Sequence, residues 1–245
     1  MDIRYIHFYQ GEPTPNLDPT LVAANAEKIF PNCQIDVRNS FYNYWGIDHY
    51  NQICDQARIS DAKQPFEKQP EVESYEVGLY DGYALQELLR SMISDGERGS
   101  EHVHIIMTDM LMCTFDEDDW RYHARAVICG TPSIVSCPGI IEAPAKPREY
   151  YMLARPGQDP HLLQNEFAGR FIEYGDSRLA SAALAYSVQA VFFFLADGEP
   201  FCENPSCRLY NAHWQEELIR ILENPIFCEK HAAILDQSNK LRKGN

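Results

Sequence analysis

Positive charge is scarce in this sequence. Its 245 residues include 21 lysines and arginines against 36 aspartates and glutamates, which gives a formal net charge of −15 at pH 7. A phosphate backbone would be repelled by that total, and no stretch rich in lysine and arginine offsets it, so we expect no nucleic-acid partner. The chain also lacks a phosphate-binding P-loop, a dinucleotide glycine fingerprint and a nucleophile elbow. The absence of these motifs argues against the enzyme classes that they identify.

Long apolar runs are equally scarce. The most apolar stretch covers residues 179–196, which falls short of the roughly 20 apolar residues that a membrane-spanning helix needs. Polar side chains interrupt it at Ser181, Tyr186, Ser187 and Gln189. We therefore predict a central core helix over residues 177–197, buried on all sides, and no membrane partner.

The beginning of the sequence lacks the apolar segment of a secretory leader, because residues 1–5 lead directly into an expected strand. Eight cysteines without such a leader are typical of a reducing compartment, so we expect a cytoplasmic protein. Five of these cysteines show no close pair spacing and are expected to be buried thiols. They are Cys33, Cys54, Cys113, Cys129 and Cys137.

The distribution of apolar residues predicts a mixed fold. Strands are expected over 3–9, 34–37, 102–107, 126–129, 133–137 and 149–154, the fourth and fifth forming a hairpin. Helices are expected over 17–30, 49–58, 82–94, 160–172, 177–197, 211–222 and 231–241, and a loop over 60–75. Strands and helices alternate early and helices dominate late. The predicted fold class is therefore α/β, a sandwich of helices on a mixed β-sheet with a helical C-terminal part.

The strongest chemical pattern lies in the last fifth of the chain. Cys202 and Cys207 are followed, after twenty residues, by Cys228 and His231, a C-x4-C-x20-C-x2-H pattern. Thiolate sulfur and imidazole nitrogen are good zinc ligands, and a structural site closes a tetrahedron with four of them. Asn204 favours a turn inside the first pair. We predict one structural zinc per chain; the alternative is two buried core cysteines beside an unrelated pair.

His102 and His104 form a weaker candidate site. They alternate on an expected strand and therefore point to the same face, where Asp109 or His123 would complete a metal site. Two ligands alone do not make a site, so this pair is a hypothesis only.

Two further groups contain acidic residues and are weighed as candidate functional sites. His213 and Glu216 share one face of an expected helix and offer an acid/base pair or a metal site, although a polar face in contact with water explains them as well. Residues 116–119 form an acidic turn without the spacing of a calcium loop, so we interpret this turn as solvated.

The C-terminal pattern resembles that of the archaemetzincins, a branch of the metzincin metalloproteases. The hallmark of that family is H-E-x-x-H-x-x-G-x-x-H-C-x4-C, followed later by a second close pair of metal ligands after a phenylalanine. Here Phe201 precedes the first pair of ligands and Phe227 precedes the second, which matches the structural-zinc half. The sequence departs from the family in having His231 where a fourth cysteine is usual, and in a slightly longer spacer.

The resemblance extends more loosely over about residues 100–235. Residues 105–109, followed by Leu111, look like the family's strand that ends in a Thr-Asp motif, and residues 133–136 look like its next edge strand. Residues 207–217 are similar to an uncharacterised archaeal group labelled as metallopeptidases. The resemblance implies a metzincin-like sandwich with a zinc-stapled C-terminal part, and an archaeal source.

Counting back from the first cysteine places the rest of the hallmark. Its third histidine falls on Phe201, its glycine on Gly198, its second histidine on Leu195, its glutamate on Phe192 and its first histidine on Val191. Catalysis in that design needs three imidazoles on zinc and a carboxylate that takes a proton from the bound water. Apolar side chains do neither. The resemblance therefore implies that the helix and its glycine are kept while the catalytic chemistry is lost.

Three functions stay open, all within a single expected domain over residues 1–245 that includes a zinc-stapled subdomain over residues 198–245. The first is a catalytically degenerate archaemetzincin-like protein with one structural zinc, which has a binding or regulatory role toward an unknown protein or peptide partner. The second is a metallohydrolase or metallopeptidase with a metal site rebuilt from other histidines, and the third is a structural or assembly subunit. One tightly bound zinc favours the first, and two metals favour the second. The histidines available for a rebuilt site are His102, His104, His123 and His213.

Overall fold

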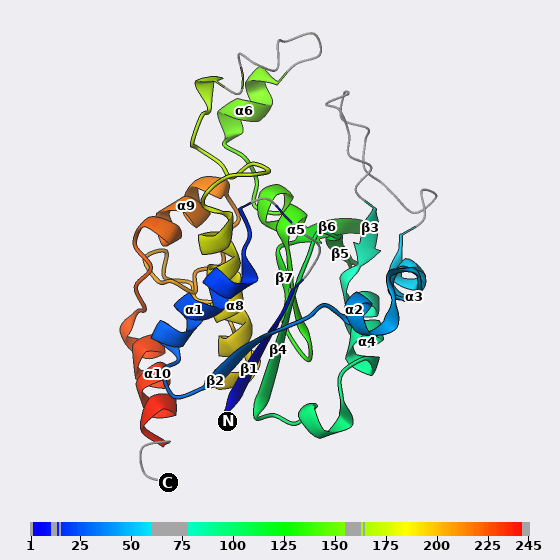
Figure 1. Cartoon of the computed structure of the whole chain (residues 1–245). Coiled ribbons are helices and arrows are strands. Elements are labelled where there is room, and N and C mark those ends of the chain that lie inside the picture. Colours follow the sequence, from blue (N-terminus) through cyan, green and yellow to red (C-terminus); the bar gives the residue numbers. More distant parts are fainter. Residues whose placement is uncertain are drawn as a thin grey trace.

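The computed structural model describes residues 2–10, 14, 16–59, 78–154, 163 and 165–241 (Figure 1). The strands in these residues are β1 Tyr5–Tyr9, β2 Gln34–Arg38, β3 Leu79–Asp81, β4 His102–Thr108, β5 Leu111–Asp116, β6 Arg121–Arg125, β7 Val127–Ile128 and β8 Ser133–Ser136. The main sheet has the order β2-β1-β4-β8-β7, and a smaller sheet has the order β3-β5-β6. In the main sheet β2, β1, β4 and β8 run parallel, while β7 pairs antiparallel with β8 as the predicted hairpin.

Helices flank the main sheet. They are α1 Pro19–Ile29, α2 Phe41–Trp45, α3 Ile47–Cys54, α4 Gly82–Ser91, α5 Cys137–Glu142, α6 Arg148–Leu153, α8 Leu179–Leu195, α9 Gln215–Glu223 and α10 Glu229–Leu241, with short 3-10 turns at Asp55–Ala57 and Asp95–Glu97. Helices α1, α8, α9 and α10 lie together on one side, and α2, α3 and α4 lie on the other (Figure 1). The predicted fold class, helices on a mixed sheet with a helical C-terminal part, is confirmed.

The two faces of β1 carry different residues because successive side chains of a strand point to opposite faces. Ile6 and Phe8 are completely buried in the main core, together with residues of α1 and α8. His7 points to the other face. The parallel neighbours are in register, so His7 lies beside Asp36 of β2 and His104 of β4. One face of the sheet therefore packs on the main core. The opposite face carries His7 and His104 toward the start of the strands, and further along it Ile106 and Ile134 belong to a second buried apolar core.

Helix α8 lies at the centre of the main core and contacts α1, α5, α9 and α10 as well as β4, β7 and β8. Every residue from 182 to 192 except Leu184 is buried, while Ser181 in the first turn is exposed. The prediction of a central core helix is confirmed, with bounds slightly inside the expected ones. None of the helices that the structure describes combines the length and the apolar character of a transmembrane segment.

Some of the expected elements are wrong. The strand expected over residues 149–154 is helix α6, in which the ring of Tyr150 packs edge-on against Phe167 and Phe171, with centroids 5.5 and 5.4 Å away. Strand β3 and the hairpin of β5 and β6, which the acidic turn joins, were not expected. The expected loop over 60–75 and the start of the expected helix over 160–172 lie outside the described residues. Of the described residues of that helix, 163, 165 and 166 are helical, whereas 167–171 form a turn and a bend.

The five cysteines outside the C-terminal pattern are only in part buried thiols. Cys54, Cys113 and Cys137 are buried as predicted, whereas Cys33 and Cys129 are half-buried. Burial raises the pKa of Cys113 to about 11, so this thiol is neutral near pH 7. It behaves as a small core residue.

Candidate metal centre

The first cysteine pair lies in the loop that follows α8. Gly198 has a φ of +93°, the left-handed conformation in which a glycine commonly ends a helix. Further along, the Asn204 side chain accepts a hydrogen bond from the N–H of Ser206 at 2.9 Å, and its carbonyl accepts one from the N–H of Cys207 at 2.9 Å. This asparagine turn brings Cys207 back toward Cys202, as the sequence indicated.

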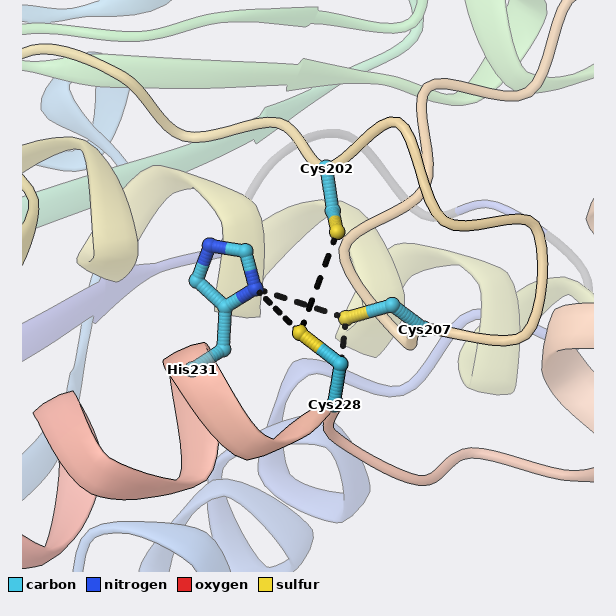
Figure 2. Close-up of side chains that lie close together, drawn as sticks. All are labelled: Cys202, Cys207, Cys228 and His231. Carbon is cyan, nitrogen blue, oxygen red and sulfur yellow. Dashed lines mark hydrogen bonds between the residues drawn. The ribbon is translucent and has the colours of Figure 1, made fainter.

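The second pair lies at the start of α10. Cys228 directly precedes the helix, and His231 lies in its first turn (Figure 2). Burial alone would raise the pKa of the Cys228 thiol, but hydrogen bonds from the backbone N–H groups of His231 and Lys230 contribute to a pKa that is lowered overall. A thiol at a helix N-terminus gives up its proton readily, and the thiolate is the form that binds zinc.

The four side chains converge on one point (Figure 2). The Sγ atoms of Cys202 and Cys228 lie 3.9 Å apart, and Nδ1 of His231 lies 3.1 Å from Sγ of Cys228 and 3.5 Å from Sγ of Cys207. In a tetrahedral zinc site, ordinary bond lengths place two sulfurs about 3.8 Å apart and a sulfur about 3.6 Å from a nitrogen. The observed separations are close to these values, so the donor set and its spacing fit one zinc ion.

The electrostatics of this group also favour a cation. Burial raises the pKa of Cys207 to about 11 and lowers the pKa of His231, so without a cation both side chains are neutral near pH 7. A bound zinc ion deprotonates its thiol ligands. Nε2 of His231 is buried and has no hydrogen-bond partner among the described residues. Nδ1 of the same ring faces the sulfurs of Cys207 and Cys228 and is the nitrogen that would bind the ion.

The residues aligned with the catalytic hallmark do not surround a metal site. Val191 and Phe192 are 1% and 0% exposed in the main core, Leu195 is half-buried, and Phe201 is 41% exposed. The ring of Phe192 stacks on that of Phe227 with centroids 5.2 Å apart. Helix α8 contains no histidine, cysteine, aspartate or glutamate. It therefore contributes packing rather than metal ligands.

A second group of candidate ligands lies on the face of the main sheet that points away from the main core. His7 of β1 and His102 and His104 of β4 each place one ring nitrogen within 4.8 Å of the others. The sequence suggested Asp109 or His123 as the third member, and the structure brings neither of them to this group. Asp109 lies past the end of β4, and His123 lies on β6 of the smaller sheet. His7 lies on an expected strand in which polar and apolar residues alternate. That pattern would have indicated the face of His7, but its place beside His104 depends on the pairing of this strand with β4.

Burial sets the charge state of these histidines. It lowers the pKa of His7, and it lowers the pKa of His104 to about 4, so both rings are neutral near pH 7. A neutral imidazole keeps a lone pair on one nitrogen, and that nitrogen can accept a hydrogen bond or bind a metal.

The acidic turn between β5 and β6 forms a third, more open group. Asp116, Asp119 and His123 bring their ligand atoms within 4.8 Å of one another, and Nε2 of His123 lies 2.9 Å from Oδ2 of Asp119. Asp119 is exposed and the other two are half-buried. This exposure agrees with our interpretation of a solvated turn.

His213 and Glu216 do not form a pair. The N–H groups of His213 and Trp214 donate to the carboxylate of Glu217 at 2.9 and 3.1 Å, which caps helix α9. Glu216 instead binds Arg170, with 2.6 Å between a carboxylate oxygen and a guanidinium nitrogen. These contacts are those of a helix terminus in contact with water, and no acid/base pair results.

Comparisons with known proteins agree with this fold. A family model described as "Probable metallopeptidase family (DUF6775)" matches residues 2–238. The crystal structure of a zinc-dependent peptidase from Methanocorpusculum labreanum (strain Z) matches with a TM-score of 0.52 at 14% sequence identity, over 94% of this chain and 99% of that chain. At that identity the likeness shows the fold alone. Among curated proteins, the sequence search found no match.

Proposed function

This chain belongs to the family described as "Probable metallopeptidase family", and from that premise we propose that it is a zinc-stapled protein that binds a protein or peptide without hydrolysing it. We propose in addition that it stands on the archaemetzincin branch with the catalytic hallmark lost. Residues 198–245 would then be the zinc-stapled part of a single domain.

The zinc would be held by Cys202, Cys207, Cys228 and His231. Four protein ligands close the coordination sphere and leave no position for a catalytic water, so the role of this ion is structural. It would join the loop after α8 to the first turn of α10, two segments that no described strand pairing holds together. Binding energy at such a site contributes directly to folding.

The loss of hydrolysis is supported best by the burial of α8. A zincin-type site needs two histidines and a glutamate on one helix face, with the glutamate free to take a proton from a zinc-bound water. Here Val191 and Phe192 are packed in the main core, and the helix has no ligand-type side chain at all. Recognition of a protein or peptide is the function that we propose for the scaffold without these groups.

Peptide hydrolysis by purified protein tests this proposal. With zinc present, we expect no release of fragments from a mixed peptide library and about one zinc in the Cys/His centre, since four ligands bind one ion. Hydrolysis that a chelator abolishes, and that substitutions at Val191 and Leu195 also abolish, would contradict it.

A metallohydrolase with a rebuilt metal site is the second candidate. The observation that favours it is the group of His7, His102 and His104, because three imidazoles are a common ligand set of catalytic zinc. Chelator-sensitive hydrolysis that His102→Gln removes, while the zinc of the Cys/His centre stays bound, would support this candidate over the first.

A further inference from the structure

The three histidines of the main sheet converge because of the strand register. His7 pairs with His104 and Tyr5 pairs with His102 across the parallel strands β1 and β4. Residues two apart on a strand share a face, so all three imidazoles lie on the same side of the sheet. Nε2 of His7 and Nδ1 of His102 are 3.0 Å apart. The ring centroids of His7 and His104 lie 4.8 Å apart.

The outer nitrogens of two of these rings already have acceptors. Nδ1 of His7 donates to Oδ1 of Asp36 at 2.8 Å, and Nε2 of His104 donates to the backbone carbonyl of Glu97 at 2.8 Å. With those protons in place, Nε2 of His7 and Nδ1 of His104 carry lone pairs. Metal-bound histidines characteristically make this same outer hydrogen bond, to a carboxylate or a carbonyl.

We propose that His7, His102 and His104 bind one divalent transition-metal ion, with zinc as the reference case. The ligand atoms would be Nε2 of His7 and Nδ1 of both His102 and His104. Three neutral imidazoles suit zinc, nickel, copper or iron, whereas magnesium and calcium prefer oxygen ligands. This site is separate from the Cys/His centre. The second candidate function rests on the same three histidines, whereas the first candidate does not depend on them.

The metal would replace two hydrogen bonds. One joins His7 to His102, and the other runs from the hydroxyl of Tyr9 to Nδ1 of His104 at 3.0 Å. Two nitrogens on a tetrahedral zinc lie about 3.3 Å apart, so the 3.0 Å between His7 and His102 has to widen only slightly. The Tyr9 hydroxyl would then give up its contact with His104 and keep the hydrogen bond that Nη1 of Arg38 donates to it at 3.3 Å.

The charges around the group balance in favour of a cation. Asp36 and Glu97 contribute two carboxylates, and Arg38 contributes one guanidinium. Arg38 is engaged by Glu97 through two contacts of 2.6 and 2.9 Å, and its Nε lies 3.3 Å from Oδ1 of Asp36. The local sum is one negative charge beside three neutral imidazoles, which suits a divalent cation.

An ion can reach this group from solvent. His102 is half-buried and the side chain of Asp36 is 39% exposed, whereas His7 and His104 are buried. The ring of Tyr5 stacks on His102 with centroids 4.5 Å apart and covers it from one side. His102 is therefore the ligand whose substitution disturbs the core least.

Metal titration of the full-length protein tests the proposal. Protein freed of metal by a chelator is titrated with Zn²⁺ by calorimetry, and the bound metal is counted by elemental analysis. We expect His102→Gln to lose one ion per chain relative to the wild type, and the exposed His213→Gln to lose none. An unchanged count in His102→Gln overturns the proposal and leaves a metal-free network of hydrogen bonds.

Cobalt distinguishes this site from the Cys/His centre. Cobalt bound by thiolates absorbs strongly through sulfur-to-metal charge transfer, and cobalt bound by imidazoles alone does not. His102→Gln should keep the thiolate absorption of the Cys/His centre and lose the second binding event. Asp36→Asn keeps the shape of the outer contact and weakens its acceptor, so we expect an affinity about 10- to 100-fold lower at the histidine site alone. Unchanged affinity in Asp36→Asn would contradict the assignment of His7.

Discussion

The rings of Phe192 and Phe227 stack with their centroids 5.2 Å apart. Phe192 belongs to the central helix α8, and Phe227 directly precedes Cys228 of the candidate zinc centre. The rings of His231 and Phe192 also pack edge-to-face, with centroids 5.8 Å apart. The main core and the zinc centre are therefore in direct contact, and Cys207 is itself buried in that core, so a change in either one should affect the stability of the other.

A matched pair of substitutions in α8 measures this packing. Phe192 is completely buried, so Phe192→Asp would place an unpaired carboxylate in the core and cost about 4 kcal/mol or more. Phe193 is half-buried, and Phe193→Asp should give a folded protein with a smaller loss of stability. Thermal melting and the yield of folded protein compare the two. Equal stability of the variants would show that α8 is not packed as described.

Removal of the zinc ligands should destabilise the C-terminal part. Cys207→Ser and Cys228→Ser are expected to lose the zinc and to lower the melting temperature by roughly 4–8 °C, which corresponds to about 2 kcal/mol for a chain of this size. Hydrogen exchange should rise in the loop after α8 and in the first turn of α10. Cys33→Ser, at a half-buried cysteine outside the centre, is the control and should keep its metal. Retention of zinc by both ligand variants would rule out this ligand set.

Two histidines in α8 should not create a peptidase. Val191→His together with Leu195→His restores the spacing of two zinc ligands, but Val191 is 1% exposed and an imidazole there would lack hydrogen-bond partners. We expect a destabilised protein without peptide hydrolysis. Melting curves and a fluorogenic peptide assay with added zinc provide the measurement. Measurable turnover by this variant would show that α8 accommodates the two imidazoles and that our expectation is wrong.

The C-terminal metal pattern could be predicted because its information is local. The close spacing within each pair and the turn at Asn204 are properties of short segments, and the structure brings all four side chains together. The central helix was predictable for a similar reason, since only a core or a membrane accepts so apolar a segment.

The histidine group was only half predictable because it depends on strand order. The alternation of His102 and His104 is visible in one segment, but His7 joins them only once β1 pairs with β4 in parallel register, 95 residues away. The position of helix α6 was missed for a related reason. Tyrosine favours strands locally, while the packing of Tyr150 against Phe167 and Phe171 is a tertiary effect.

The ion pair of Glu97 and Arg38 should make stability depend on pH in the acid range. The hydrogen bonds from Arg38 lower the pKa of Glu97 from its ordinary 4.5 to about 2. A depressed carboxyl pKa in the folded state stabilises the protein above the unfolded pKa, and this contribution is lost as the pH falls from about 4.5 toward 2. Because both side chains are partly exposed, we expect about 1–2 kcal/mol rather than the full value of the shift. Glu97→Gln should therefore be less stable than the wild type at pH 7, and the two stabilities should converge near pH 2.

Urea unfolding at a series of pH values measures this difference. The control is Glu101→Gln, which should show little change because the Glu101 carboxylate lies 3.4 Å from Arg4 at the exposed surface. A gap between wild type and Glu97→Gln that stays constant from pH 7 to pH 2 would mean that the carboxylate does not titrate through this pair.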